Sequence, residues 1–71
     1  MTAFVVNEKY QLSPMMREKT IRGKPVVFKG DRQMPDEDFV RASVRVVKED
    51  GTEGDEWLVQ RGFILPLETQ S

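Results

Sequence analysis

Residues 39–48 read Phe-Val-Arg-Ala-Ser-Val-Arg-Val-Val-Lys and alternate apolar and polar side chains more regularly than any other stretch of the chain. An Asp-Gly pair follows at Asp50 and Gly51, and residues 55–60 (Asp-Glu-Trp-Leu-Val-Gln) form a second alternating run. Two such runs around an Asp-Gly pair are the strongest short-range signal for a β-hairpin. The sequence therefore predicts antiparallel strands over residues 39–48 and 55–60.

A two-residue turn at Asp50 and Gly51 would fix which residues of the two strands face each other. The resulting cross-strand pairs are Val46 with Asp55, Arg45 with Glu56, Val44 with Trp57 and Ala42 with Val59. One face of this hairpin is then almost entirely apolar, as a core face should be, and consists of Val40, Ala42, Val44, Val46, Trp57 and Val59. A bulge at Glu53 and Gly54 would instead shift the second strand by one residue and turn Trp57 outward, where it would be the leading ligand contact.

Shorter apolar runs predict the other elements. Strands are expected over residues 4–6, 10–12 and 25–29, a turn or one helical turn over residues 15–20, and a last strand or tight turn over residues 62–67. The polar residues 30–38 form the longest expected loop. Short strands with frequent turns favour an antiparallel meander that closes into a small barrel or forms a rolled sheet.

The end of the hairpin and the residues after it, from Trp57 to Gly62-Phe63-Ile64-Leu65-Pro66, resemble the layout of SH3-like small barrels. In those barrels a Gly-aromatic-aliphatic-Pro turn follows the last long hairpin. The resemblance implies an all-β fold, a small antiparallel meander closed into an SH3-like barrel or rolled sheet with at most one short helical turn. The acidic-aromatic motif by which signalling SH3 domains bind proline-rich peptides is missing from the N-terminal strand, so the resemblance implies no ligand.

Length and composition limit the function classes. A chain of 71 residues forms one small β-rich domain over residues 1–71, with a frayed tail at residues 68–71, and it buries only about 60% of its unfolded surface. The sequence contains no Cys and no His, which removes thiol nucleophiles, zinc thiolates and the commonest general base. We therefore expect no enzyme, no cofactor and no metal, a cytoplasmic location, and no membrane segment.

Three motifs that suggest chemistry have simpler explanations. The acidic run Asp36-Glu37-Asp38 lacks the alternating oxygen ligands of a cation loop and is interpreted as a solvated loop. Neither a Walker-type nor a dinucleotide-type glycine motif occurs around Gly23 or Gly30. No serine has an obvious activating base, so no catalytic residue is predicted.

Binding of another protein is the leading functional hypothesis. The polar loop that contains Met34 ends at Phe39, and the hairpin pairing places Phe39 near Gly62 and beside Phe63. Aromatic residues and methionine are enriched in interface cores, and loops on a rigid sheet often carry function. The sequence therefore predicts a partner-binding patch of Met34, Phe39 and Phe63, with the alternative that N-terminal residues cover both rings. Met15 and Met16 are interpreted either as a soft contact surface or as a lid over the open end of a barrel.

Single-stranded nucleic acid or RNA is the alternative ligand. Arg41 and Arg45 share the polar face of the hairpin, and Arg61 follows it. Small β-barrels bind single strands with such basic stripes and stacked aromatics. The nearly balanced charge, 11 basic and 12 acidic residues with a net charge of -1, gives no overall attraction for a polyanion. Glu56 would also neutralise Arg45, which favours a solvated, charge-paired face.

Overall fold

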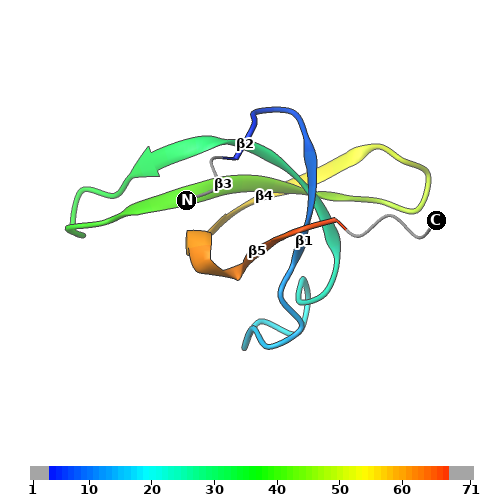
Figure 1. Cartoon of the computed structure of the whole chain (residues 1–71), viewed down its shortest axis with the longest axis horizontal. Helices are drawn as coiled ribbons and strands as arrows, with labels where there is room; N and C mark the ends of the chain where they lie inside the picture. The colour runs from blue at the N-terminus through cyan, green and yellow to red at the C-terminus, as the bar shows by residue number, and fades with distance from the viewer. Residues whose placement is uncertain (1–3, 68–71) are drawn as a thin grey trace.

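The computed structural model describes residues 4–67 and forms one five-stranded antiparallel sheet with a single short 3-10 turn (Figure 1). The elements are β1 (Lys9–Leu12), β2 (Pro25–Gln33), β3 (Val40–Val47), β4 (Glu53–Val59), η1 (Arg61–Phe63) and β5 (Ile64–Pro66). No helix within this part of the chain is long and apolar enough to cross a membrane. The predicted all-β class is confirmed, whereas residues 1–3 and the predicted frayed tail at residues 68–71 lie outside the described residues.

The sheet is open. Its strands are hydrogen-bonded in the order β4-β3-β2-β1-β5, so β4 and β5 are the two edges and do not pair with each other in residues 4–67. Closure into a barrel is therefore not observed. Strong twist instead turns β1 across the direction of β3 and β4, as Figure 1 shows. Because β4 pairs only with β3, its other edge has no strand beside it in the described structure.

The predicted hairpin register is confirmed over most of its length. Val44 lies opposite Trp57, and the neighbouring predicted pairs, Ala42 with Val59 and Arg45 with Glu56, are also present. Alternation of β-branched and small residues along β3 favours this pairing, because a one-residue shift would place the apolar row in water. The strands nearly match their predicted bounds, with β3 at Val40–Val47 and β4 at Glu53–Val59.

The turn of the hairpin differs from the prediction. The Gly51 N–H donates to the Lys48 carbonyl at 2.9 Å and the Lys48 N–H donates to the Thr52 carbonyl at 2.8 Å, so Glu49, Asp50 and Gly51 form the loop. Gly51 has φ 88°, which is typical of the last residue in such a three-residue loop. An irregularity between Arg45 and Val47 compensates for the extra loop residue, and Val47 faces Glu53 in place of the predicted pairing of Val46 with Asp55.

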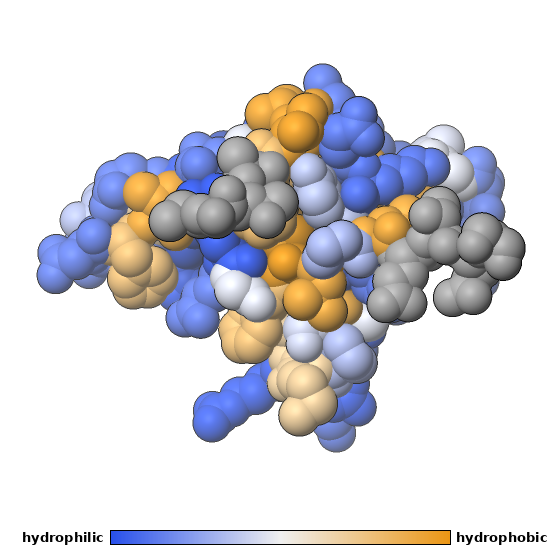
Figure 2. Space-filling view, in the orientation of Figure 1, coloured by the Kyte–Doolittle hydropathy of each residue, from blue (hydrophilic) through white to orange (hydrophobic). Residues whose placement is uncertain are grey.

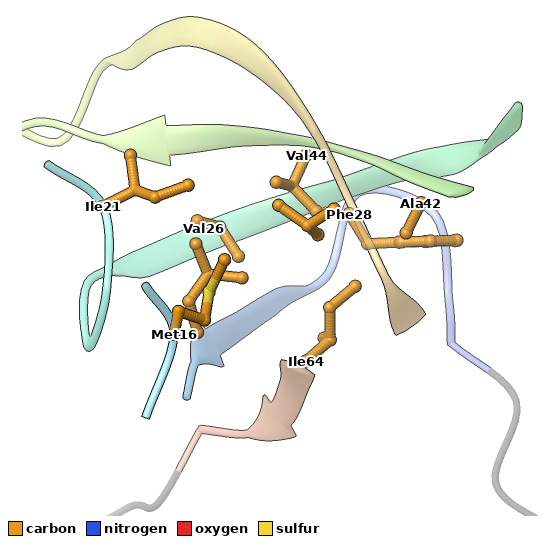
Figure 3. Close-up of a cluster of buried hydrophobic side chains, with 9 residues drawn as sticks. Met16, Ile21, Val26, Phe28, Ala42, Val44 and Ile64 are labelled. Carbon is orange, nitrogen blue, oxygen red and sulfur yellow. The ribbon is translucent and has the colours of Figure 1, made fainter. Parts of the chain in front are cut away.

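The core lies inside the bend of the sheet. Figure 3 shows side chains of β2, β3, β5 and the segment before β2 pointing toward one another. The buried cluster comprises Leu12, Met16, Ile21, Val26, Phe28, Ala42, Val44, Val59 and Ile64. Val40 was predicted on this face but is 38% exposed, because it lies at the start of β3 opposite Gln33, away from the bend.

Two other expectations need correction. Residues 4–6 do not form a strand, and Phe4 instead packs its ring against Tyr10 and Phe28 at centroid distances of 5.2 and 5.5 Å. β2 extends to Gln33, so the polar loop is shorter than predicted and begins at Met34. Residues 15–20 form turns as expected, and the 3-10 turn lies at Arg61–Phe63.

Candidate functional site

Exposed apolar residues do not by themselves locate a site. On the face that Figure 2 shows, hydrophobic residues form several separate areas with hydrophilic residues between them. The large apolar residues that are exposed in the described structure come from several elements and are Val5, Val6, Met15, Phe39, Val40, Leu65 and Leu67. Concave surface with apolar lining is the more specific indicator of a binding site.

A groove of about 260 Å³ runs beside β4, and we call it the β4 groove. Trp57, the sole tryptophan of the chain, is half-buried in its wall and packs against the core. The lining residues come from the segment before β2, from β3, from the second half of β4 and from η1, and they are Met16, Glu18, Ile21, Arg41, Trp57, Leu58, Val59, Gln60 and Phe63. The groove therefore combines an apolar interior with charged residues at its margin.

The outer wall of the groove is held in place by turns in residues 13–24. Ser13 accepts the Met15 N–H on its hydroxyl at 3.1 Å and the Met16 N–H on its carbonyl at 3.3 Å. The Ser13 N–H donates to the Phe63 carbonyl at 2.8 Å, which ties this segment to η1. Burial of Ile21 and Met16, only 2% and 7% exposed, anchors the wall to the core.

The backbone direction of β2 can be read from its hydrogen bonds to the N-terminal segment. The Asn7 N–H donates to the Phe28 carbonyl at 2.8 Å, and the Phe28 N–H donates to the Glu8 carbonyl at 3.0 Å. Both backbone groups of Phe28 thus face β1. Because these groups alternate sides along an antiparallel strand, those of Val27 face β3.

The same alternation determines which backbone groups of β4 are free. Val27 lies opposite Arg45, so the groups of Arg45 face β2 and those of Val44 face β4. Trp57 lies opposite Val44, and its N–H and carbonyl therefore point to β3. The backbone groups that point away from the sheet, at the unpaired edge beside the groove, belong to Glu56, Leu58 and Gln60.

Charges at the groove margin are unevenly paired. The Arg41 guanidinium donates to both carboxylate oxygens of Glu37 at 2.8 and 2.7 Å, and this hydrogen bonding lowers the pKa of Glu37. Glu18 accepts the Thr20 N–H at 3.2 Å. Glu18 forms no salt bridge with another residue of the 4–67 range. One carboxylate that lines the groove therefore lacks a cation, while its arginine already has an anion.

The three residues predicted to bind a protein partner occupy different positions. Phe63 is half-buried and lines the β4 groove. Met34 lines a second hollow, which shares Arg41 and Leu58 with the groove. Phe39 is 45% exposed, lines neither hollow, and lies 5.2 Å beneath the Arg41 guanidinium. Arg41 thus connects the surroundings of all three residues, and whether any of them contacts a partner stays a prediction.

The three arginines predicted for nucleic acid have protein partners. Arg41 pairs with Glu37, and Arg61 lies 3.5 Å from Asp31. Arg45 donates to the Gly54 carbonyl at 3.4 Å and faces Glu56 across the hairpin.

Glu56 lies on the polar face of the hairpin, which we call the outer face, and is held there as a carboxylate. It accepts the Ser43 hydroxyl, and Arg32 lies 3.4 Å away. The Ser43 hydrogen bond, followed by the charges of Arg32 and Arg45, lowers the pKa of Glu56. Carboxylates therefore interrupt the positive charge along this face.

Reasoning from the sequence missed the groove because its outer wall has no periodic pattern. Met16 was singled out as a possible lid or contact, but Glu18, Ile21 and Gln60 carried no signal. Leu58 did carry one, as an apolar residue on the polar face of the hairpin.

No group of three or more acidic, histidine or cysteine side chains in residues 4–67 is placed to hold a metal ion. Comparison of the chain with protein-family models, with curated proteins and with solved structures found no match. The function is therefore inferred from the residues and their geometry.

Proposed function

We propose that this chain is a non-enzymatic binding or regulatory module, and that it contacts another protein through the β4 groove. One observation carries the proposal: the sole tryptophan is only partly buried, in a largely apolar groove beside a strand edge that is unpaired in the described structure. Tryptophan, phenylalanine and methionine are enriched in the cores of protein interfaces. Trp57, Phe63 and Met16 supply all three residue types in one concave site.

The proposed absence of catalysis rests on the residue types available. The whole sequence lacks His and Cys, so the commonest general base and the thiol nucleophile are both missing. Glu37 and Glu56 have lowered pKa values, which is opposite to the shift that a general acid requires. The likeness to SH3-like barrels is part of the same proposal, and the Gly-Phe-Ile-Leu-Pro sequence at residues 62–66 after the hairpin supports it.

Site-specific photocrosslinking tests the proposed function. Gln60 is exposed and lines the groove, whereas Lys9 is exposed on β1 and lines none of the hollows described above. A photoreactive residue at position 60 should give protease-sensitive products in lysate that excess unmodified chain suppresses. The same residue at position 9 should give none of these products. Equal products from both positions, or none from position 60, would contradict the proposal.

Nucleic acid is the alternative outcome of this experiment. Products that disappear after nuclease treatment would favour binding through Arg41, Arg45 and Arg61. Oligonucleotide affinity should then fall by roughly 0.7 log units per log unit of salt for each phosphate contact with a single strand. Because carboxylates already accompany these arginines, we expect no detectable binding to mixed single- and double-stranded oligonucleotides at low salt.

A further inference from the structure

The two halves of the β4 edge differ in how they are protected. Glu53, Asp55 and Glu56 and the irregularity beside them occupy the half near the hairpin turn. Charged residues and bulges are the usual means by which edge strands avoid pairing with other chains. The half from Trp57 to Gln60 carries no charged side chain and borders the groove. Protection is thus missing where the concave surface begins.

In the half of the edge from Trp57 to Gln60, unpaired backbone groups indicate which hydrogen-bonding groups a ligand should offer. The N–H and carbonyl of Leu58 point away from β3, and so does the N–H of Gln60. The Gln60 carbonyl is already used, because it accepts the Phe63 N–H at 3.0 Å. An extended polypeptide offers donors and acceptors at the spacing that such an edge requires. We propose that an extended segment of a partner protein adds to residues 56–60 as a further strand, an inference that rests on the proposed function.

The groove also specifies side chains of that segment. Side chains on the inner face of an added strand would lie beside Trp57 and Val59, with Met16, Ile21 and Phe63 around them. An alternating segment with apolar residues on this face fits that lining. Glu18 lies at the same groove without a cation from the described residues, so a Lys or Arg of the segment would supply its missing partner.

Charge favours such a segment over a second copy of this chain. The strand that a second copy would present is β4 itself, which carries Glu53, Asp55 and Glu56. Pairing of two β4 edges would bring these acids toward a groove that already contains Glu18. Like charges placed together oppose association, whereas a basic extended segment complements the groove.

Gln60 offers a substitution that tests backbone pairing directly. Its backbone has φ -70° and ψ 138°, which proline adopts without strain. Gln60→Pro removes the outward N–H, and the β3–β4 ladder does not use this group. Gln60→Ala is the matched control, because it removes the same side chain and keeps the N–H.

The binding experiment uses the whole chain and a pool of synthetic decapeptides with Val, Ile or Phe at every second position and Lys or Ser between them. Trp57 reports binding through its fluorescence, since it is the only tryptophan and lines the groove. We expect Lys-containing peptides to shift its emission to the blue. Gln60→Pro should bind these peptides about three- to tenfold more weakly than Gln60→Ala, the effect of one lost hydrogen bond, because both variants lack the same side chain.

Each other result contradicts the proposal in a distinct way. Equal affinity for Gln60→Pro and Gln60→Ala would overturn strand addition and leave groove binding intact. No binding of any peptide, together with position-60 crosslinks to protein, would also overturn strand addition alone, whereas the loss of both would overturn the proposed function as well. Dimers in sedimentation that Gln60→Pro dissociates would assign the edge to a second copy.

Discussion

The outer face of the hairpin and the β4 groove are built from the same two strands but treat charge differently. On the outer face, Arg32 and Arg41 lie within salt-bridge distance of Glu56 and Glu37. In the groove, Glu18 has no cation from residues 4–67, and apolar walls replace charged ones. Charged groups of the outer face thus have partners within the chain. The groove, in the described structure, has an apolar surface, a carboxylate and backbone groups that lack partners.

This difference shows that the side of a strand on which a residue lies does not reveal whether its charge is available. Alternation correctly placed Arg41 away from the core row, but its partner Glu37 comes from the loop before β3. Asp31, the partner of Arg61, comes from the extension of β2 that the sequence pattern did not predict. A binding surface is therefore better identified by groups without partners than by a stripe of one residue type.

The largest expected effect is the difference in stability cost between a substitution in the core and one on the outer face. Phe28 is 3% exposed, so Phe28→Ala should lower the free energy of unfolding by about 3–5 kcal/mol. Phe39 is 45% exposed, and Phe39→Ala should cost less than about 1 kcal/mol, including its contact with Arg41. Urea titrations of the two variants measure their free energies of unfolding. Similar costs would mean that the outer face contributes a second core.

A smaller effect tests the turn of the hairpin that carries both regions. Gly51 has φ 88°, so Gly51→Ala should destabilise the fold by roughly 1–2 kcal/mol. Gly62 has no neighbouring atom within 4 Å of an added Cβ and is not among the positive-φ glycines, so Gly62→Ala should be neutral or slightly stabilising. Thermal melts of the pair provide the measurement. A neutral Gly51→Ala would rule out the three-residue loop.

The smallest effect is the dependence of stability on acid pH. Hydrogen bonds from Arg41 and Ser43 lower the pKa values of Glu37 and Glu56 below their ordinary value of 4.5. Their stabilising contribution is therefore complete above that value and is lost as pH falls through the lowered values. The urea midpoint should stay level from about pH 7 to 5.5, because the chain has no histidine, and then fall.

The matched control for this prediction is the double variant Glu37→Gln and Glu56→Gln. It should be less stable than the parent at pH 7 and should lose less stability between pH 5.5 and 3. Parallel pH profiles for the two proteins would show that these outer-face carboxylates do not stabilise the fold.

The hairpin could be predicted from the sequence because its information is local. Alternation along residues 39–48 requires one face to be buried, and together with the assumed turn at Asp50 and Gly51 it predicted the pairing of Val44 with Trp57. The turn was wrong by one residue, and the irregularity near Gly54 concealed the error because it shifts the register back. The extra residue in the loop and the irregularity in the strands shift the register in opposite directions, so the apolar pattern of residues 55–60 is the same with both changes as with neither.

The groove could not be predicted because its geometry depends on contacts between distant segments. Ile21 and Met16 lie in turns without periodicity, and only their packing on the sheet places them opposite Trp57. The open edge of β4 was also unpredictable, since the short strands suggested closure that β4 and β5 do not make. The predicted contact residue Phe63 does line this groove, although Phe39 and Met34 lie outside it.

Amide hydrogen exchange measured by NMR tests the central claim most directly, namely that β4 has a free edge at the groove. The N–H groups of Trp57 and Val59 point to β3 and should be protected. Those of Glu56, Leu58 and Gln60 point outward and should exchange close to the rate of an unstructured chain. Slow exchange at Trp57 and Val59 together with fast exchange at Glu56, Leu58 and Gln60 would support a free β4 edge. Strong protection of Leu58 and Gln60 would contradict it, because their N–H groups would then already have partners within the protein.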